Sequence, residues 1–299
     1  MDWRKYNDEL VMRGEYLIRL SFLDNWHQEL SEMNRSKSGR PYKYPDSFFR
    51  WLAPLKIFLD YRALEGFVSG LSKYVPQLEV ADYTTIWRRL NSLDYDLPRV
   101  ETLKDFIAAY DTTGIKVTSR GEWIRHKWKV RRGWIKVAVT YGFTPGEDEK
   151  HIIGIELSTE ETPDDDLLHE TFRHMDDRHI KNMDSLLADG AMYTNKTFDL
   201  LNRYGIDPGI KIRKNASTLS RGSPARAKAV REFKDLGYDK WREVKKYGLR
   251  WHVEGLFSAV KRKFGESVRA IKHENMLREA RMKFIVYENM KIYGKSRAN

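Results

Sequence analysis

Apolar and polar residues follow a helical period through the first third of the chain. The apolar positions before residue 34 predict a helical N-terminus, and residues 36–45 form a basic, turn-rich linker. The pattern then predicts three amphipathic helices, over residues 46–59, 61–73 and 82–93. Asp82 is expected to cap the last of them, because a carboxylate at this position can accept the first free backbone N–H groups. The N-terminal region should therefore be entirely helical.

Beyond residue 100 the period changes, and short apolar runs alternate with helical segments. Strands are predicted at 106–117, 134–142, 151–158, 184–189 and 209–213. A helix should open after Thr162, with Asp164, Asp165 and Asp166 placed favourably against its dipole as caps and surface residues, and another should span 195–204. Residues 216–240 are basic and carry no clear period. This alternation favours an α/β or α+β layer structure.

Length and composition support a folded protein of more than one part. The chain has 299 residues, of which 41% are hydrophobic and 13% aromatic, so a larger domain and a smaller one can each have a core. It contains no cysteine, which excludes disulfides, thiolate zinc sites and cysteine nucleophiles. His169 and His174 lack the spacing of a helical zinc pair. No apolar run reaches membrane-spanning length and the N-terminus is polar, so we expect a soluble, cytoplasmic protein.

Positive charge is concentrated near the C-terminus. The formal net charge is +11, but residues 211–299 hold 24 basic and 9 acidic residues, whereas residues 1–210 hold 30 and 34. A basic field of this kind suits a polyanion, because neutralising phosphates releases counterions. The alternative is that the charge serves solubility alone.

One segment inside the basic region combines four chemically distinct residues at fixed spacing. Tyr247, Arg250, Glu254 and Lys261 follow the pattern Tyr-x2-Arg-x3-Glu-x6-Lys. The apolar positions around them predict one helix, with Arg250, Glu254 and Lys261 on one face. Its buried side is expected to contain Trp251, Val253, Leu256, Phe257 and Val260. An ordinary solvated ion-pair face is the alternative interpretation.

Two aspartates stand on or just past short apolar runs that predict strands. Asp111 follows the apolar run FIAAY, and Asp189 follows SLLA and precedes Gly190. Either could be a plain turn residue. Carboxylates at the ends of neighbouring strands can instead converge on Mg²⁺, which prefers hard oxygen ligands.

The segments around these residues resemble the DDE transposases of prokaryotic insertion sequences, in particular the insertion-sequence-5-like group. The resemblance rests on DTTGIKV from Asp111, on ADGA around Asp189 and on the Tyr247 to Lys261 signature. The segments GRPYKYPD from Gly39 and DYTTIWRR from Asp82 extend it across most of the chain. Two departures are visible: Met192 precedes Tyr193 where the family more usually has Gly-Ala-Tyr, and Arg213, Lys214 and Asn215 follow Ile212 where a proline is more usual. Both concern the handling of DNA ends.

This resemblance implies an RNase H-like catalytic domain with a mixed central sheet and two Mg²⁺ or Mn²⁺ ions. It implies that Asp111 bridges both ions, while Asp189 and Glu254 each hold one. Two such cations about 4 Å apart stabilise the charge that develops in phosphodiester cleavage, and a 3′ hydroxyl as nucleophile gives strand transfer. Residues expected to contact DNA near this site are Tyr247, Arg250, Lys261, Arg213, Lys214, Asn215 and Tyr193, and Met192 or Tyr193 could stack on a flipped base.

The three helices before residue 100 match a helix-turn-helix whose last helix presents Thr84, Thr85, Arg88 and Arg89 to the major groove. A plain three-helix bundle with Trp87 and Leu90 in its core is the alternative. Basic and aromatic residues also alternate between Arg120 and Lys136, which could grip a nucleic acid or form an ordinary hairpin.

The predicted domains are an N-terminal arm and linker (1–45), a helix-turn-helix-like domain (46–100), a catalytic domain (101–292) and a tail (293–299). We expect a nucleoid-associated DNA transposase that binds terminal inverted repeats and target DNA as a homodimer. A DNA-binding protein with a silent catalytic fold, and an RNase H-like nuclease without strand transfer, remain open.

Overall fold

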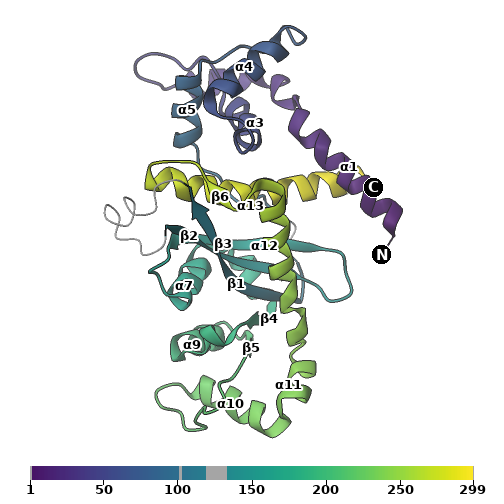
Figure 1. Cartoon of the computed structure of the whole chain (residues 1–299), viewed down its shortest axis with the longest axis vertical. Coiled ribbons are helices and arrows are strands. Elements are labelled where there is room, and N and C mark those ends of the chain that lie inside the picture. Colours follow the sequence, from purple (N-terminus) through teal and green to yellow (C-terminus); the bar gives the residue numbers. More distant parts are fainter. Residues whose placement is uncertain (1, 101–102, 119–132, 299) are drawn as a thin grey trace. The chain divides into compact units, whose positions relative to one another are not determined.

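The computed structural model describes residues 2–100, 103–118 and 133–298. Contacts between residues divide the chain into two compact units. Unit 1 comprises residues 1–96 and 282–299, and unit 2 comprises residues 97–281. Figure 1 shows helices in the described part of the first unit and a sheet with helices in the second.

Unit 1 is formed by the predicted N-terminal helices and one end of a C-terminal helix. Its elements are α1 (Trp3–Glu15), η1 (Tyr16–Ile18), η2 (Ser21–Leu23), α2 (Trp26–Asn34), α3 (Asp46–Lys56), α4 (Tyr61–Ser72) and α5 (Tyr83–Ser92). Aromatic rings from Phe22, Trp26, Phe48 and Trp51 pack at tilted angles in its core. The three amphipathic helices are confirmed within three residues, and Asp82 caps α5.

The C-terminal helix α13 (His273–Arg297) brings the end of the chain to its beginning. The hydroxyl of Tyr293 donates to Glu15 Oε1 at 3.1 Å. A Cβ on Gly294 would lie only 2.4 Å from the backbone oxygen of Glu9, so α1 and α13 pack at very close range in unit 1. The apolar pattern did not predict this helix.

Unit 2 is built on a mixed sheet, which has six strands among the described residues. Its strands are β1 (Phe106–Val117), β2 (Trp134–Phe143), β3 (Lys150–Thr159), β4 (Met183–Ala188), β5 (Asp207–Ile210) and β6 (Ser267–Val268). They lie in the order β3-β2-β1-β4-β5, and β6 pairs with β1. The antiparallel pairs are β1 with β2 and β2 with β3, whereas β4 runs parallel to both β1 and β5. Four of the five predicted strands match closely, and β5 begins and ends two or three residues early.

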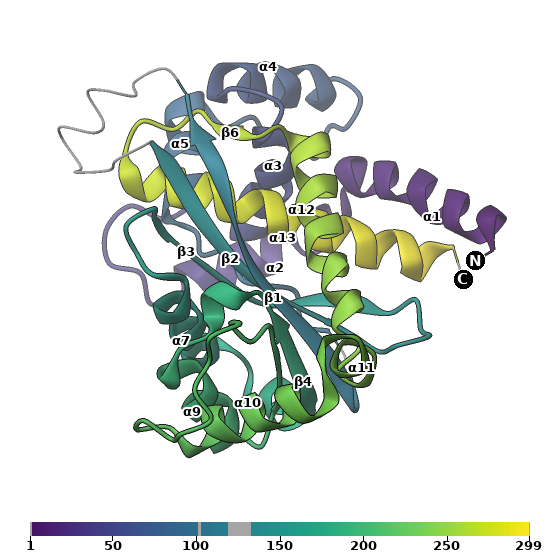
Figure 2. The ribbon, with the colours of Figure 1, turned by 60° about the horizontal axis from the view of Figure 1, so that its bottom comes forward.

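Helices cover both faces of this sheet (Figure 2). The helical segments described in unit 2 before α13 are α7 (Asp164–His174), α8 (Asp177–Lys181), η3 (Gly190–Met192), α9 (Asn195–Arg203), α10 (Pro224–Leu236), α11 (Tyr238–Val244), η4 (Tyr247–Arg250) and α12 (Trp251–Phe264). Tyr110 shares a core with Leu168 and Phe172 of α7. Asp111, the next residue on β1, points to the other face, because successive side chains of a strand alternate. The sheet thus separates α7 from the side on which Asp111 lies.

Two sequence expectations need correction. Residues 216–240 are not unpatterned chain, since they contain all of α10 and the start of α11. Pro224 opens α10, and the Ser223 hydroxyl accepts the N–H of Arg226 at 3.2 Å. The segment from Tyr247 to Lys261 is also not one α-helix, because a 3₁₀ turn over Tyr247–Arg250 leads into α12. The fold class itself, a mixed α/β structure with a helical N-terminus, is as expected.

Candidate active site

Asp111 and Asp189 are neighbours across two parallel strands. In the register of β1 and β4, Ala109 lies opposite Leu187. Two residues further along each chain are Asp111, still on β1, and Asp189, just past the end of β4. Parallel strands lie about 4.8 Å apart and residues in register share a face. The sheet therefore brings both carboxylates to one side.

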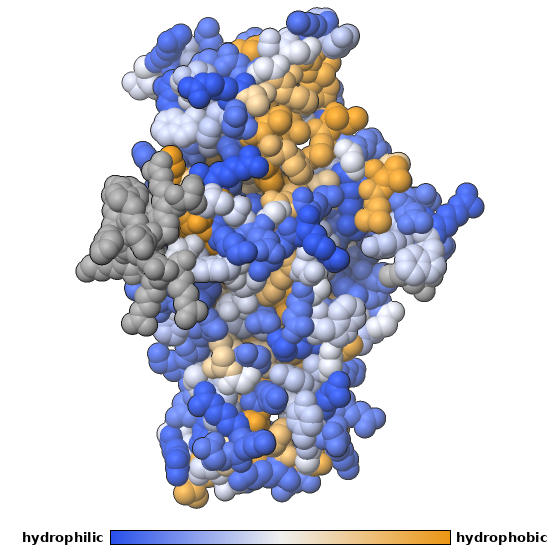
Figure 3. Space-filling view, in the orientation of Figure 1, coloured by the Kyte–Doolittle hydropathy of each residue, from blue (hydrophilic) through white to orange (hydrophobic). Residues whose placement is uncertain are grey.

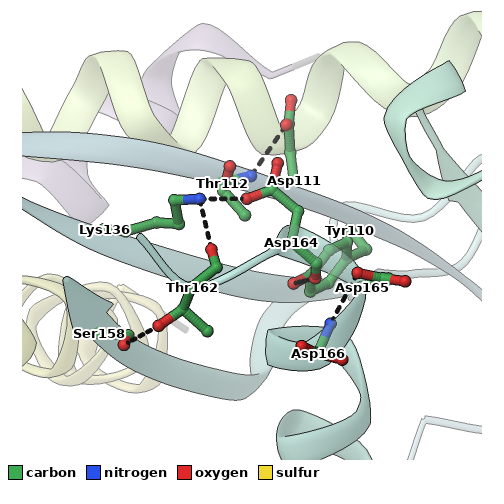
Figure 4. Close-up of polar contacts among 9 residues, drawn as sticks. All are labelled: Tyr110, Asp111, Thr112, Lys136, Ser158, Thr162, Asp164, Asp165 and Asp166. Atoms are coloured by element: carbon green, nitrogen blue, oxygen red, sulfur yellow. Dashed lines mark hydrogen bonds and ion pairs between the residues drawn. The ribbon is translucent and has the colours of Figure 1, made fainter. Parts of the chain in front are cut away.

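Each aspartate is fixed by a backbone N–H beside it. The N–H of Thr112 donates to Asp111 Oδ1 at 2.8 Å, as drawn in Figure 4. The N–H of Ala191 donates to Asp189 Oδ1 at 2.7 Å and caps η3. Asp189 thus caps a turn, as the alternative interpretation of this residue predicted. This capping bond does not exclude a second role, because a carboxylate has a further oxygen to offer.

Arg250 connects Asp111 to Glu254. Its Nη1 donates to Asp111 Oδ2 at 2.8 Å, and its Nη2 forms an ion pair with Glu254 Oε1. Glu254 lies in the first turn of α12 and its side chain is 52% exposed. Two residues that are 139 positions apart in the sequence are thus in direct contact, and Glu254 is brought to the same face of the sheet.

Burial and charge act on the protonation of this site. Burial raises the pKa of the Asp111 carboxyl, the Thr112 N–H and the Arg250 guanidinium oppose that rise, and the charge of Asp189 adds to it. Burial likewise raises the pKa of Tyr247, so its phenol stays protonated and can donate a hydrogen bond. Asp111 is therefore a partly buried carboxyl whose ionised form is favoured first by the Thr112 N–H and then by the Arg250 guanidinium.

The donor set fits a divalent cation in its chemistry. Three carboxylates supply the hard oxygens that Mg²⁺ and Mn²⁺ prefer. A positive group already lies between Asp111 and Glu254, namely the Arg250 guanidinium. Among the described residues, no three acidic or histidine side chains form a group that could hold a metal ion.

The remaining residues of the signature occupy different environments. Lys261 lies two turns beyond Glu254 in the last turn of α12, about 10 Å along the helix axis. Its charge acts on Glu266, whose pKa is lowered first by Lys116 and further by Lys261. On the buried side of α12, Val253, Leu256, Phe257 and Val260 pack as expected. Trp251 does not, because it is 56% exposed, three residues before Glu254.

Tyr193 is held inside the fold by an arginine that the sequence pattern did not single out. Arg226, which is buried in α10, donates from Nη1 to the Tyr193 hydroxyl at 2.6 Å and from Nη2 to the Leu219 carbonyl at 2.8 Å. The Arg213 guanidinium lies 5.6 Å from the centre of the Tyr193 ring. Met192 is 3% exposed, so the suggestion that it stacks on a base does not fit the structure. In the sequence, Arg226 was marked only by its place in a basic segment, which did not indicate that it binds Tyr193.

Lys214 and Asn215 are exposed, as is Arg213, in the segment after β5. Further exposed basic residues follow on α10 and α11, interspersed with acidic ones: Lys228, Arg231, Lys234, Lys240 and Arg242. Figure 3 shows a largely hydrophilic surface over this end of unit 2. The basic field expected from composition is thus solvent-facing here.

The candidate residues of α5 divide into two groups. The Thr84 and Thr85 hydroxyls both donate to Asp82, and Arg89 forms an ion pair with Asp46 while its guanidinium lies 4.5 Å from the centre of the Tyr42 ring. These three side chains therefore make contacts within unit 1. Arg88 is exposed.

The alternative core assignment for α5 is half right. Leu90 is buried, as a three-helix bundle requires, but Trp87 is 39% exposed. The exposed face of α5 thus includes an aromatic ring next to Arg88.

The acidic cluster at the start of α7 lies apart from the site. Asp164 accepts from Lys136 Nζ at 2.7 Å, and its backbone oxygen accepts from the Tyr110 hydroxyl at 2.8 Å (Figure 4). Asp166 pairs with Lys196 at 3.3 Å. Tyr110 is on the face of β1 opposite Asp111. Asp164, Asp165 and Asp166 lie in the first turn of α7, where acidic residues were expected to favour the helix dipole. Most of the basic and aromatic stretch from Arg120 to Lys136 lies outside the described residues.

Within the described ranges, no helix combines the length and apolar character needed to cross a bilayer.

Two family models, both described as a transposase DDE domain, match the chain, one over residues 104–288 and the other over residues 11–120. The first match contains Asp111, Asp189 and Glu254 and spans the mixed sheet with its covering helices. The chain belongs to the DDE transposases, with an RNase H-like catalytic domain and a helical N-terminal region.

Proposed function

We propose that this protein cuts DNA at the ends of an insertion sequence and joins those ends to target DNA. The observation that carries the proposal is the placement of three carboxylates in a chain of the DDE family. Asp111 and Asp189 share a face through strand register, and Arg250 brings Glu254 to Asp111. We also propose membership of the insertion-sequence-5-like group, on the sequence motifs alone.

Asp111, Asp189 and Glu254 are the residues that would hold the divalent ions used by DDE transposases. When bound, two Mg²⁺ or Mn²⁺ ions supply the positive charge that activates the attacking oxygen and stabilises the leaving one. The chain itself provides an anchored ligand set, because the Thr112 and Ala191 N–H groups fix one oxygen of each aspartate.

Phosphate binding is assigned to the basic and phenolic groups around the carboxylates. Arg250 and Tyr247 can donate to phosphate oxygens, and Lys261 adds a point charge two turns along α12. Arg213, Lys214 and Asn215 are exposed and can contact a DNA backbone. Tyr193, restrained by Arg226, would line the path of the DNA end through its ring face.

Unit 1 is proposed to recognise the terminal repeats. On α5, Arg88 and the exposed ring of Trp87 can meet DNA directly. Thr84, Thr85 and Arg89 would support α5 through Asp82 and Asp46, and contact DNA only after those bonds open. Two copies acting on two element ends would give a homodimer on the nucleoid.

The test is site-specific nicking of a duplex that carries the element's terminal sequence, with Mg²⁺ or Mn²⁺. We expect the wild type to nick at the end, and Asp111→Asn, Asp189→Asn and Glu254→Gln each to reduce nicking by at least about a hundredfold. That magnitude follows because even residues that merely support a metal ligand are worth about 10- to 100-fold. Asp166→Asn, which removes an equal charge on the other face of the sheet, should nick normally.

Equal nicking by all variants would contradict the assignment of the three carboxylates. Sequence-specific binding with no nicking by the wild type under either metal would instead support a DNA-binding protein with a silent catalytic fold.

A further inference from the structure

Arg250 occupies the place of a cation between two carboxylates. Its Nη1 donates to Asp111 Oδ2 at 2.8 Å, and its Nη2 forms an ion pair with Glu254 Oε1. The side chains of Arg250 and Asp111 are 22% and 24% exposed, so this ion pair is largely shielded from water, whereas Glu254 is 52% exposed. Such charge-assisted bonds are stronger than neutral ones, and partial burial strengthens them further. The guanidinium is a firmly held counter-ion of the site.

The same two carboxylates are the proposed metal ligands on β1 and α12. An oxygen that accepts a hydrogen bond from a guanidinium is less available to a metal ion, and a fixed positive charge nearby repels a second one. The Thr112 N–H already binds Asp111 Oδ1, and Arg250 binds the other oxygen, Oδ2. The guanidinium and a metal ion would therefore compete for Oδ2.

We propose that Arg250 competes with the divalent ion for Asp111 and Glu254, and that a DNA phosphate relieves this competition by drawing Arg250 away. The inference rests on the proposed function and deepens it. Arginine suits the exchange, because its planar fork binds a phosphate as well as it binds carboxylates. Arg250 begins α12 from the last position of the 3₁₀ turn η4, so its side chain can change partners while Glu254 stays on the helix.

A direct consequence is that DNA and metal strengthen each other's binding. If the phosphate removes Arg250 from the carboxylates, the ion binds more tightly in the presence of DNA. By thermodynamic linkage, DNA must then bind more tightly in the presence of the ion by the same factor. The protein would bind divalent ions weakly until DNA is bound. Cleavage would therefore be limited to the protein–DNA complex.

The test is Mn²⁺ binding to the full chain without DNA, measured by isothermal titration calorimetry. We expect Arg250→Gln to bind Mn²⁺ about tenfold more tightly than the wild type, within the usual range of coupling between two sites. Arg262→Gln is the matched control, because it removes the same charge from the exposed side of α12. It should leave Mn²⁺ affinity near the wild-type value.

Arg250→Lys distinguishes competition through bridging hydrogen bonds from the effect of a positive charge alone. Lysine keeps the charge but cannot bridge two carboxylates with a fork. Tighter Mn²⁺ binding by Arg250→Lys supports the proposal, whereas wild-type affinity in this variant would overturn it. Equal affinity in Arg250→Gln and Arg262→Gln would also overturn it.

The second measurement repeats the titration with a mixed-sequence DNA duplex at low salt. The wild type should gain Mn²⁺ affinity when the duplex is present, and Arg250→Gln should gain much less. An equal gain in both would overturn the role assigned to DNA. The proposed function fails separately, if Glu254→Gln leaves Mn²⁺ binding unchanged from the wild type.

Discussion

Two side chains each hold an element in place: Asp82 caps the start of α5, and Arg250 links Asp111 on β1 to Glu254 on α12. Asp82 caps α5 through the N–H groups of Thr84 and Thr85, each at 2.9 Å, and the sequence predicted this because a cap acts on its immediate neighbours. The contact between Arg250 and Asp111 was beyond such reasoning, since it depends on how the sheet and α12 pack. The sequence identified Arg250 and Asp111 as candidate site residues, but it did not predict that their side chains are in contact.

Asp82→Ala should destabilise the protein by about 1 kcal/mol, because α5 loses the acceptor for its first N–H groups. Asp82→Asn retains an oxygen acceptor and should lose less. Hydrogen bonds from Thr84 and Thr85 lower the pKa of Asp82 well below its ordinary value. A lowered folded-state pKa contributes stability that is complete above the unfolded value of about 4 and lost as the pH falls below it.

Chemical denaturation at pH 7 and at pH 3 measures this effect. The free energy of unfolding of Asp82→Ala should lie closer to that of the wild type at pH 3 than at pH 7. A difference that is constant across this range, or larger in acid, would show that the carboxylate is not the cap.

Elements with one buried face were predicted well, and elements without such a face were missed. The strands of unit 2 and the helices α3, α4 and α5 carry clear periods. In α13, residues 282–286 are all buried, so no polar face marks the helix in the sequence. In α10, the signal was local, with Ser223 followed by Pro224 at the first turn, and the surrounding basic residues obscured it.

The close packing of α1 and α13 in unit 1 is tested by Gly294→Ala. The added Cβ would lie 2.4 Å from the Glu9 backbone oxygen and 2.9 Å from Arg13 Cγ, and the backbone cannot move aside without separating the helices. We expect a decrease in stability of about 1–3 kcal/mol, the usual range for overpacking. Thermal unfolding followed by circular dichroism measures the change.

Gly70→Ala is the matched control, because Gly70 is a helical glycine in α4 with no atom within 4 Å of the added Cβ. It should be neutral or raise stability by up to about 1 kcal/mol. Equal melting temperatures for both variants would contradict the close crossing of α1 and α13.

At the scale of the whole molecule, motif spacing predicted the family and alternating periods predicted the fold class. The sequence did not predict which basic side chains remain exposed, and the proposed DNA contacts depend on those. Arg213 and Lys214 remain exposed, whereas Arg226 and Arg89 bind groups within the fold. Charge counts cannot make that distinction.

DNA affinity should therefore fall steeply with salt. Replacing Arg213 and Lys214 together by Gln should reduce the slope of log K against log salt by about 1 for each phosphate that the protein no longer neutralises. Fluorescence anisotropy with a mixed-sequence duplex gives the slope. Arg203→Gln, at an exposed position on α9, is the control. An unchanged slope in the double variant would place the DNA elsewhere.

The proposed function is tested most sharply by strand transfer of a duplex that ends in the element's terminal sequence with a free 3′ hydroxyl, into a plasmid, with Mg²⁺. We expect joined products from the wild type and from Asp166→Asn, and none from Glu254→Gln, although Glu254→Gln still binds the duplex. Joining by Glu254→Gln at the wild-type rate would contradict the role of this carboxylate. Cleavage of the duplex by the wild type without any joining would contradict transposition and mark the protein as a nuclease.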